Sequence, residues 1–161
     1  MEKRNDHAMT IVFWVTGSLV TLSLFLEHIM GLSPCYLCLK ERSIHMILCV
    51  ASLILMRTSV PHRLGLGLLW GGVLASILLA GAHAGFEYGW WYLDLPCQAD
   101  LSLPMSLGQM PDQLNLKAPP RCDEPALVFA GLSLAGANFL ISLGLLVLLS
   151  KALMRSAPQS S

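Results

Sequence analysis

Long runs without charged residues dominate the hydrophobic pattern of this chain. Three such runs, residues 8–26, 64–86 and 125–150, contain 19, 23 and 26 residues with no Asp, Glu, Lys or Arg. A helix of about 20 apolar residues crosses a hydrocarbon core of about 30 Å. Each run therefore predicts a membrane-spanning helix.

A fourth uncharged run, residues 43–56, has only 14 residues. At about 1.5 Å per residue, a helix of this length is too short to cross a membrane by itself. It crosses only if the helix begins earlier, near Pro34, and carries Lys40, Glu41 and Arg42 in its first turns. The expected spans are about 8–28, 36–56, 64–87 and 125–150.

The composition supports this prediction and excludes other classes of protein. Of the 161 residues, 55% are hydrophobic and 12% are charged, whereas a soluble domain carries about 25% charge. Ten basic residues balance ten acidic ones without a basic cluster, which argues against disorder and nucleic-acid binding. We expect an all-α membrane protein, a four-transmembrane-helix bundle forming one domain over residues 1–161.

The orientation of the four spans follows from the basic residues. The first run is longer than the apolar region of a signal peptide and no clear cleavage site follows it, so we interpret it as a retained span. Six Lys or Arg flank the termini and the middle connection, against four on the other side, and such residues favour the cytoplasm. We therefore expect both termini in the cytoplasm, and loops of about 29–35 and 88–124 on the outer face.

The long outer loop carries two membrane-interface features. Residues 101–116 mix Leu and Met with polar residues, and they can form a short amphipathic helix on the membrane surface. Tyr88, Trp90, Trp91 and Tyr92 follow the third predicted span. We interpret these aromatic residues as an interfacial belt.

Four of the five cysteines fall on the outer face. Cys35 and Cys38 form a C-x-x-C motif, and Cys97 and Cys122 are separated by 24 residues in the long loop. Thiols in an oxidising compartment normally pair. Two pairs are therefore available, Cys35–Cys38 and Cys97–Cys122.

The C-x-x-C motif has the features of a reactive site. Ser33 and Pro34 predict a helix N-cap and a first helical residue, which places Cys35 and Cys38 in the first turns. The unpaired amides and the positive dipole end of a helix stabilise a thiolate there. Arg42 lies four residues after Cys38, on the same helix face. This arrangement predicts an activated, electron-donating thiol at the membrane boundary.

Two other interpretations of the cysteines are open. Zinc prefers four ligands, and no second C-x-x-C or H-x-x-x-H motif is present, so we expect no metal. As structural disulfides, a Cys97–Cys122 bridge would stabilise the fold by about 3–4 kcal/mol. A bridge within C-x-x-C closes a tiny loop and would add little stability. Both pairs would have a function if one pair exchanges disulfides with a soluble protein and the other donates electrons to a lipid-soluble quinone.

With these features the sequence resembles the DsbB family, the bacterial membrane quinone reductases that reoxidise the periplasmic dithiol oxidase DsbA. The resemblance covers nearly the whole chain. It rests on the four spans, the C-x-x-C that opens the second span, the following Glu41-Arg42, and the pair Cys97 and Cys122 in the second outer loop.

The resemblance implies a role for each residue of this set. Cys97 would form the mixed disulfide with the partner, and Cys122 would then bridge to Cys35 in an interloop disulfide. Cys38 would be released as the thiolate that donates to the quinone. Arg42 would hold the quinone and stabilise its charge.

The resemblance extends to the end of the third span. His83 corresponds to a histidine that neighbours the quinone in family members, and Glu87 lies four residues further on the same helix face. An ionisable residue inside a membrane is a functional candidate, so we expect His83 and Glu87 at the quinone site. We interpret Cys49 as a buried small hydrophobe. The other ionisable residues near these helix ends, which we interpret as packing or interfacial, are Glu27, His28 and His45.

The resemblance also implies the partners and the location. The protein would be a monomeric, multi-pass protein of the bacterial inner membrane that uses a periplasmic thioredoxin-fold oxidase like DsbA and the membrane quinone pool, ubiquinone or menaquinone. One rival is a quinone reductase like vitamin-K-epoxide reductase, although in that family the C-x-x-C follows the loop cysteines. The other rival is a four-span structural or assembly protein with inert disulfides.

Overall fold

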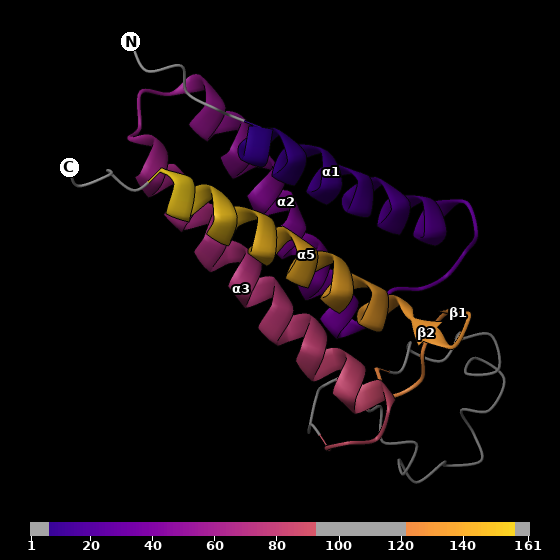
Figure 1. The fold of residues 1–161 in the computed structure, drawn as a ribbon. Helices are drawn as coiled ribbons and strands as arrows, with labels where there is room; N and C mark the ends of the chain where they lie inside the picture. The colour runs from indigo at the N-terminus through magenta and orange to yellow at the C-terminus, as the bar shows by residue number, and fades with distance from the viewer. Residues whose placement is uncertain (1–6, 93–121, 157–161) are drawn as a thin grey trace, which may run out of the picture.

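Four long helices form the part of the chain that the computed structural model describes, residues 7–92 and 122–156. They are α1 (His7–His28), α2 (Tyr36–Arg57), α3 (His62–Glu87) and α5 (Leu134–Arg155). They form an elongated bundle in which the start of α1 and the end of α5 lie at the same end (Figure 1). The helical fold predicted from the sequence is therefore confirmed.

Three of these helices are long and apolar enough to cross a membrane. They are α1, α3 and α5. Helix α2 also has 22 residues, but its first turns carry Lys40, Glu41 and Arg42. Its crossing of the membrane therefore stays a prediction from the sequence.

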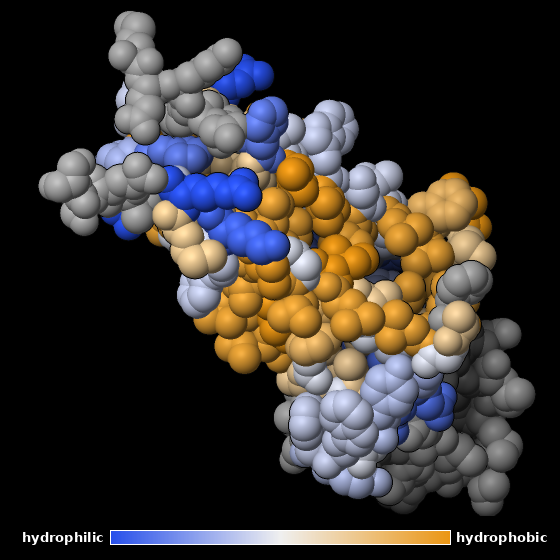
Figure 2. All heavy atoms as spheres, in the orientation of Figure 1, coloured by the Kyte–Doolittle hydropathy of each residue, from blue (hydrophilic) through white to orange (hydrophobic). Residues whose placement is uncertain are grey.

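The outward side chains of the bundle are largely apolar. Figure 2 shows a hydrophobic band across the middle of the visible face, with more hydrophilic residues towards both ends. A continuous apolar surface of this kind is unfavourable in water and suits contact with lipid. Exposed large apolar residues include Trp14, Ile47, Leu68, Leu78, Leu140 and Val147.

The helices pack unequally around the core. Contacts are most extensive between α3 and α5 and between α1 and α2, whereas α1 and α5 touch only sparsely. The seam between α1 and α5 is therefore loosely packed. The main buried cluster includes Met9, Val12, Leu48, Leu66, Leu69, Val73 and Leu149.

A short β-hairpin precedes the last helix, which the hydrophobic pattern did not predict. Strand β1 (Val128–Phe129) pairs antiparallel with β2 (Leu132–Ser133). Ala130 and Gly131 form the turn with φ of 52° and 81°, the left-handed pair typical of a tight hairpin. Because this turn interrupts the uncharged run, α5 begins at Leu134 and not at residue 125.

Candidate functional site

The C-x-x-C motif lies at the outer end of α2. Cys35 is the N-cap residue, and its sulfur accepts a hydrogen bond from the Cys38 amide at 3.2 Å. The sequence-based cap at Ser33 with Pro34 as first helical residue was therefore wrong, because the Cys35 sulfur takes the place of the usual oxygen acceptor. Cys38 still lies in the first turn, where the helix dipole favours a negative charge.

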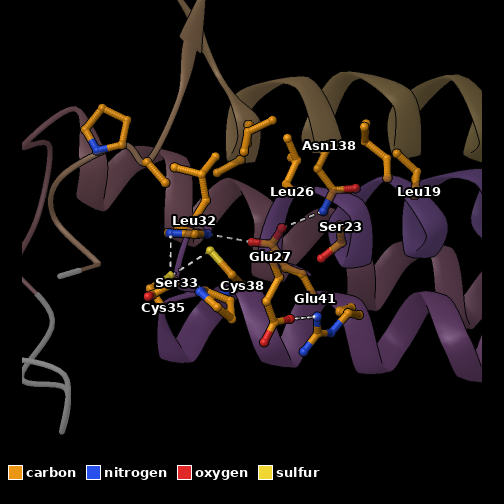
Figure 3. Close-up of a pocket in the computed structure, with 18 of the residues that line it drawn as sticks. Leu19, Ser23, Leu26, Glu27, Leu32, Ser33, Cys35, Cys38, Glu41 and Asn138 are labelled. Carbon is orange, nitrogen blue, oxygen red and sulfur yellow. Dashed lines mark hydrogen bonds and ion pairs between the residues drawn. The ribbon is translucent and has the colours of Figure 1, made fainter. Parts of the chain in front are cut away.

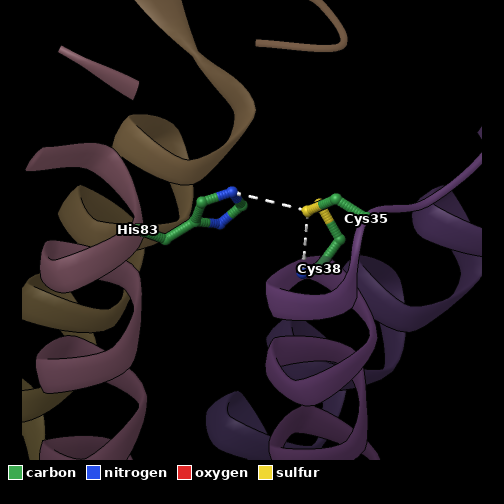
Figure 4. A group of neighbouring side chains, drawn as sticks. All are labelled: Cys35, Cys38 and His83. Atoms are coloured by element: carbon green, nitrogen blue, oxygen red, sulfur yellow. Dashed lines mark hydrogen bonds between the residues drawn. The ribbon is translucent and has the colours of Figure 1, made fainter. Parts of the chain in front are cut away.

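The two sulfurs lie close together and face a histidine from another helix. Cys35 and Cys38 are both thiols with their sulfurs 2.7 Å apart. The Nε2 atom of His83, from α3, lies 3.5 Å from the Cys35 sulfur (Figure 4). His83, which we expected at the quinone site from the sequence, therefore lies beside the dithiol.

His83 is held by carboxylates on both sides. Its Nδ1 atom lies 2.7 Å from Oε1 of Glu41 on α2, and its Nε2 atom lies 3.6 Å from Oε1 of Glu87 on α3. The His83 side chain is 2% exposed. The imidazole is therefore held between two carboxylates while the ring faces Cys35.

Glu41 is also bonded to the last helix. Its Oε2 atom accepts a hydrogen bond from Nδ2 of Asn138 at 2.6 Å. The Asn138 Oδ1 atom in turn lies 2.7 Å from Nε2 of His45. Side chains from α2, α3 and α5 thus form one buried polar array behind the dithiol.

A cavity of about 330 Å³ adjoins this array. Leucines of α1 and of the following loop line it together with polar residues of α1, α2 and α5 (Figure 3). The cavity can therefore hold a molecule with a large apolar part and a few acceptor groups. Its lining includes Leu19, Leu22, Leu26, Cys38, Glu41, Arg42, His45, His83, Glu87 and Asn138.

Arg42 lines the cavity but does not stand unpaired beside the thiols. Its guanidinium forms an ion pair with the Glu27 carboxylate of α1. Glu27, for which the sequence predicted a packing or interfacial role, thus makes a more specific contact. The group observed next to the sulfurs is the His83 imidazole.

Cys122 lies in the same buried region as the C-x-x-C motif. It is 3% exposed and belongs to a small cluster with Cys35, Leu37 and Phe86, against which Cys38 packs. Cys97, its predicted pair, lies outside the described residues, as does the predicted interfacial helix at 101–116. The structure therefore brings three of the four outer cysteines together.

The surroundings of Cys35 make the two thiols differ in how readily they lose a proton. The hydrogen bond to the Cys38 sulfur and burial both raise the pKa of the Cys35 thiol above its ordinary value. Cys35 therefore retains its proton and can donate it towards Cys38. This arrangement favours Cys38 as the site of negative charge in the reduced pair.

Cys35, Cys38 and His83 have the donor atoms of a soft-metal site. These atoms lie within 4.8 Å of one another. Zinc–sulfur bonds of about 2.3 Å place two tetrahedral thiolates about 3.8 Å apart, whereas these sulfurs are 2.7 Å apart. The sulfurs would have to separate to share an ion, so the arrangement suits dithiol–disulfide exchange better.

The remaining ionisable and cysteine candidates lie in different settings. His28 is exposed at the end of α1. Cys49 is half-buried, and its thiol donates to the Phe13 carbonyl at 3.8 Å. His45, which was assigned to packing, is buried and bonded within the polar array. Only the spacing of Glu41 and His45, four residues apart on one helix face, hinted at this arrangement.

Comparisons with known proteins identify the family of this chain. The family model for disulfide bond formation protein DsbB matches residues 5–152. A disulfide bond formation protein B of Marinobacter nauticus is 30% identical over 166 residues, covering 93% of this chain and 95% of that protein. The uncharacterized protein RP370 of Rickettsia prowazekii is 26% identical over 151 residues, covering 91% and 88%. No solved structure matches this chain significantly.

Apolar helices that end at a buried dithiol, beside a histidine and a cavity, define an integral membrane protein with a thiol-based redox site. The chain belongs to the DsbB family of disulfide bond formation proteins. Membership implies disulfide oxidoreductase activity and a place in the bacterial inner membrane.

Proposed function

We propose that this protein reoxidises a periplasmic DsbA-like dithiol oxidase and passes the electrons to a membrane quinone. The observation that carries the proposal is the cavity of about 330 Å³, which Cys38, Arg42 and His83 line together. An electron-donating thiol and hydrogen-bond donors thus adjoin a space suited to a lipid-soluble acceptor. The activity supports disulfide bond formation in exported proteins.

The cavity residues match the chemistry of a quinone. A quinone ring is flat and apolar, and its two carbonyl oxygens accept hydrogen bonds. Leu19, Leu22 and Leu26 of α1 offer an apolar wall, while Arg42 and His83 carry N–H donors. The loosely packed seam between α1 and α5 offers a route from the lipid. Ubiquinone and menaquinone both satisfy these requirements.

Two cysteine pairs carry the electrons in this proposal. Cys97 forms a mixed disulfide with the partner, and the partner's second thiol then displaces Cys97, leaving the partner oxidised and the pair Cys97–Cys122 reduced. Cys122 then attacks Cys35 of the oxidised Cys35–Cys38 pair, which breaks that bond, forms an interloop disulfide and releases Cys38. The shared burial of Cys35 and Cys122 supports this step. Cys97 next displaces Cys35 from Cys122, which restores the Cys97–Cys122 disulfide and leaves Cys35 and Cys38 reduced. The partner loses two electrons and two protons, and the quinone gains both to become a quinol.

The membrane arrangement that we propose has four spans, with both termini cytoplasmic and the dithiol facing the periplasm. Helix α2 becomes the fourth span because Glu41 and Arg42 are satisfied inside the protein, while Lys40 is exposed in the first turns, near the outer end of the helix. Glu41 is 7% exposed and hydrogen-bonded, and Arg42 is paired with Glu27. Intramembrane charges that face the bundle and pair in this way are tolerated. One chain holds the whole site, so it acts as a monomer.

The test is quinone reduction by the detergent-purified protein. The substrate is a reduced DsbA-type thioredoxin-fold protein, and the acceptors are soluble ubiquinone and menaquinone analogues. We expect turnover in the wild type and in Cys49→Ser, which alters a cysteine away from the dithiol, and none in Cys38→Ser. No turnover with any partner and quinone, from a protein whose disulfides remain intact, would favour a structural role with inert disulfides.

A further inference from the structure

The buried polar array extends further into the bundle than the proposed electron transfer requires. Glu41, His45, His83 and Asn138 are 7%, 4%, 2% and 8% exposed, and they come from three helices. Burying such groups without partners costs several kcal/mol each in an apolar medium. An array that serves no purpose would therefore be costly to keep.

The donors and acceptors of this array allow one arrangement. An ionised carboxylate only accepts hydrogen bonds, so the Glu41 oxygens receive the Nδ1–H of His83 at 2.7 Å and the Nδ2–H of Asn138 at 2.6 Å. The Asn138 carbonyl oxygen then faces His45 and accepts its Nε2–H at 2.7 Å. The order of bonds runs from His45 through Asn138 to Glu41.

We propose that His45 and Asn138 are positioning residues, which hold the Glu41 carboxylate and, through it, the His83 imidazole at the Cys35 sulfur. The inference rests on the proposed function and assigns two residues that make no contact with the sulfurs. His83 binds Glu41 through Nδ1, so its Nε2 atom faces Cys35 at 3.5 Å. A protonated His83 in this position offsets the negative charge of the dithiol when a thiolate forms.

The array itself gains and loses no electrons. One proton moves between the dithiol and His83 Nε2, and it returns when the pair is reprotonated or passes to the acceptor with the electrons. Other charged or titratable groups on the packed elements also face this region. They are Glu27 of α1, Cys35, Cys38 and Arg42 at α2, Glu87 of α3, and Cys122 and Glu124 of the segment before the β-hairpin.

The first test removes the amide and follows the dithiol directly. Asn138→Leu leaves Glu41 without its second donor, so the carboxylate is no longer fixed in place and no longer holds the His83 imidazole at the Cys35 sulfur. We expect the pH midpoint for iodoacetamide alkylation of the reduced 35–38 peptide, read by mass spectrometry, to rise by about one unit. With quinone present, kcat should fall about tenfold while the quinone KM changes less than about twofold.

A second pair of variants separates positioning from titration. His45→Phe removes the donor to Asn138, whereas His45→Gln keeps an N–H donor but cannot titrate. Positioning predicts that His45→Phe raises the alkylation midpoint and that His45→Gln restores it. Ser52→Ala is the control, because Ser52 is buried on the same helix but its hydroxyl donates to the Cys49 carbonyl at 2.8 Å, and this variant should behave as the wild type.

Several outcomes would overturn the inference. An unchanged midpoint in folded Asn138→Leu or His45→Phe would do so, as would a His45→Gln variant as impaired as His45→Phe. A rise in quinone KM alone would instead identify ligand contact. If Asn138→Leu does not fold, the comparison of His45→Phe with His45→Gln tests the inference. Alkylation requires neither quinone nor partner, so failure of the proposed electron transfer is distinguishable from failure of this inference.

Discussion

Arg42 of α2 is ion-paired with Glu27 of α1, and both residues line the cavity beside the dithiol. The pair joins two helices at the end of the bundle where the C-x-x-C motif lies. It also fixes the direction of the guanidinium, whose other N–H groups stay available to an acceptor because Arg carries five donors. Glu27 thus acts on the cavity through the orientation of Arg42.

Replacing Arg42 by Lys should weaken quinone use and spare exchange with the partner. Lysine keeps the charge but loses the planar fork that can bind Glu27 and a quinone oxygen together. We expect the quinone KM to rise about five- to tenfold, equivalent to about 1–1.4 kcal/mol of binding. Steady-state kinetics with varied quinone and saturating partner measures the change.

The matched control for this variant is Lys40→Arg, since Lys40 is exposed on the same helix and does not line the cavity. It should leave the quinone KM unchanged. A KM that is the same in Arg42→Lys and in the wild type would contradict the role of Arg42 at the cavity.

The two cysteine pairs should divide the reaction between them. Cys97→Ala should abolish the covalent complex with the partner, because the exchanging sulfur is lost. Cys38→Ala should still form that complex but stop electron flow to quinone. Non-reducing gel electrophoresis measures the complex, and quinone absorbance measures the flow. Loss of the complex alone in both variants would contradict this division of roles.

The reduced C-x-x-C pair should react unequally with alkylating agents. The contact with the Cys38 sulfur and burial raise the pKa of Cys35, so Cys35 stays protonated as the pH passes through about 8.5, where an ordinary thiol ionises. Brief treatment with iodoacetamide at pH 8 should therefore label Cys38 ahead of Cys35. Peptide mass spectrometry distinguishes the two sites, and equal labelling would show that the pair is not polarised.

The sequence predicted the helices well because their signal is local. Uncharged runs and the C-x-x-C spacing located α1, α2 and α3 to within a few residues. The start of α5 was placed too early because the Ala130–Gly131 turn lies inside an uncharged run, and hydropathy alone does not separate a hairpin from a helix.

The contacts of the site were harder to predict because they join residues that are distant in the sequence. The bond between Glu41 and Asn138 spans 97 residues, and the pair of Arg42 and Glu27 depends on how α1 packs against α2. A lone asparagine or glutamate in an apolar helix does not identify its partner. His83 was found because a family resemblance singled it out and because it is an ionisable residue inside an apolar helix.

The glycine next to the site should be sensitive to a single added methyl group. A Cβ atom at Gly85 would lie 2.2 Å from the Trp91 ring, whose Nε1–H donates to the Ala82 carbonyl at 3.0 Å. Gly85→Ala should displace this rigid ring, break its hydrogen bond and destabilise the fold by about 1–3 kcal/mol, with a red shift in tryptophan fluorescence. A Cβ atom at Gly71 would have no neighbour within 4 Å, so Gly71→Ala should be neutral or should stabilise the fold by up to about 1 kcal/mol. Thermal unfolding in detergent compares the two variants, and equal stability would mean that Trp91 does not pack on Gly85.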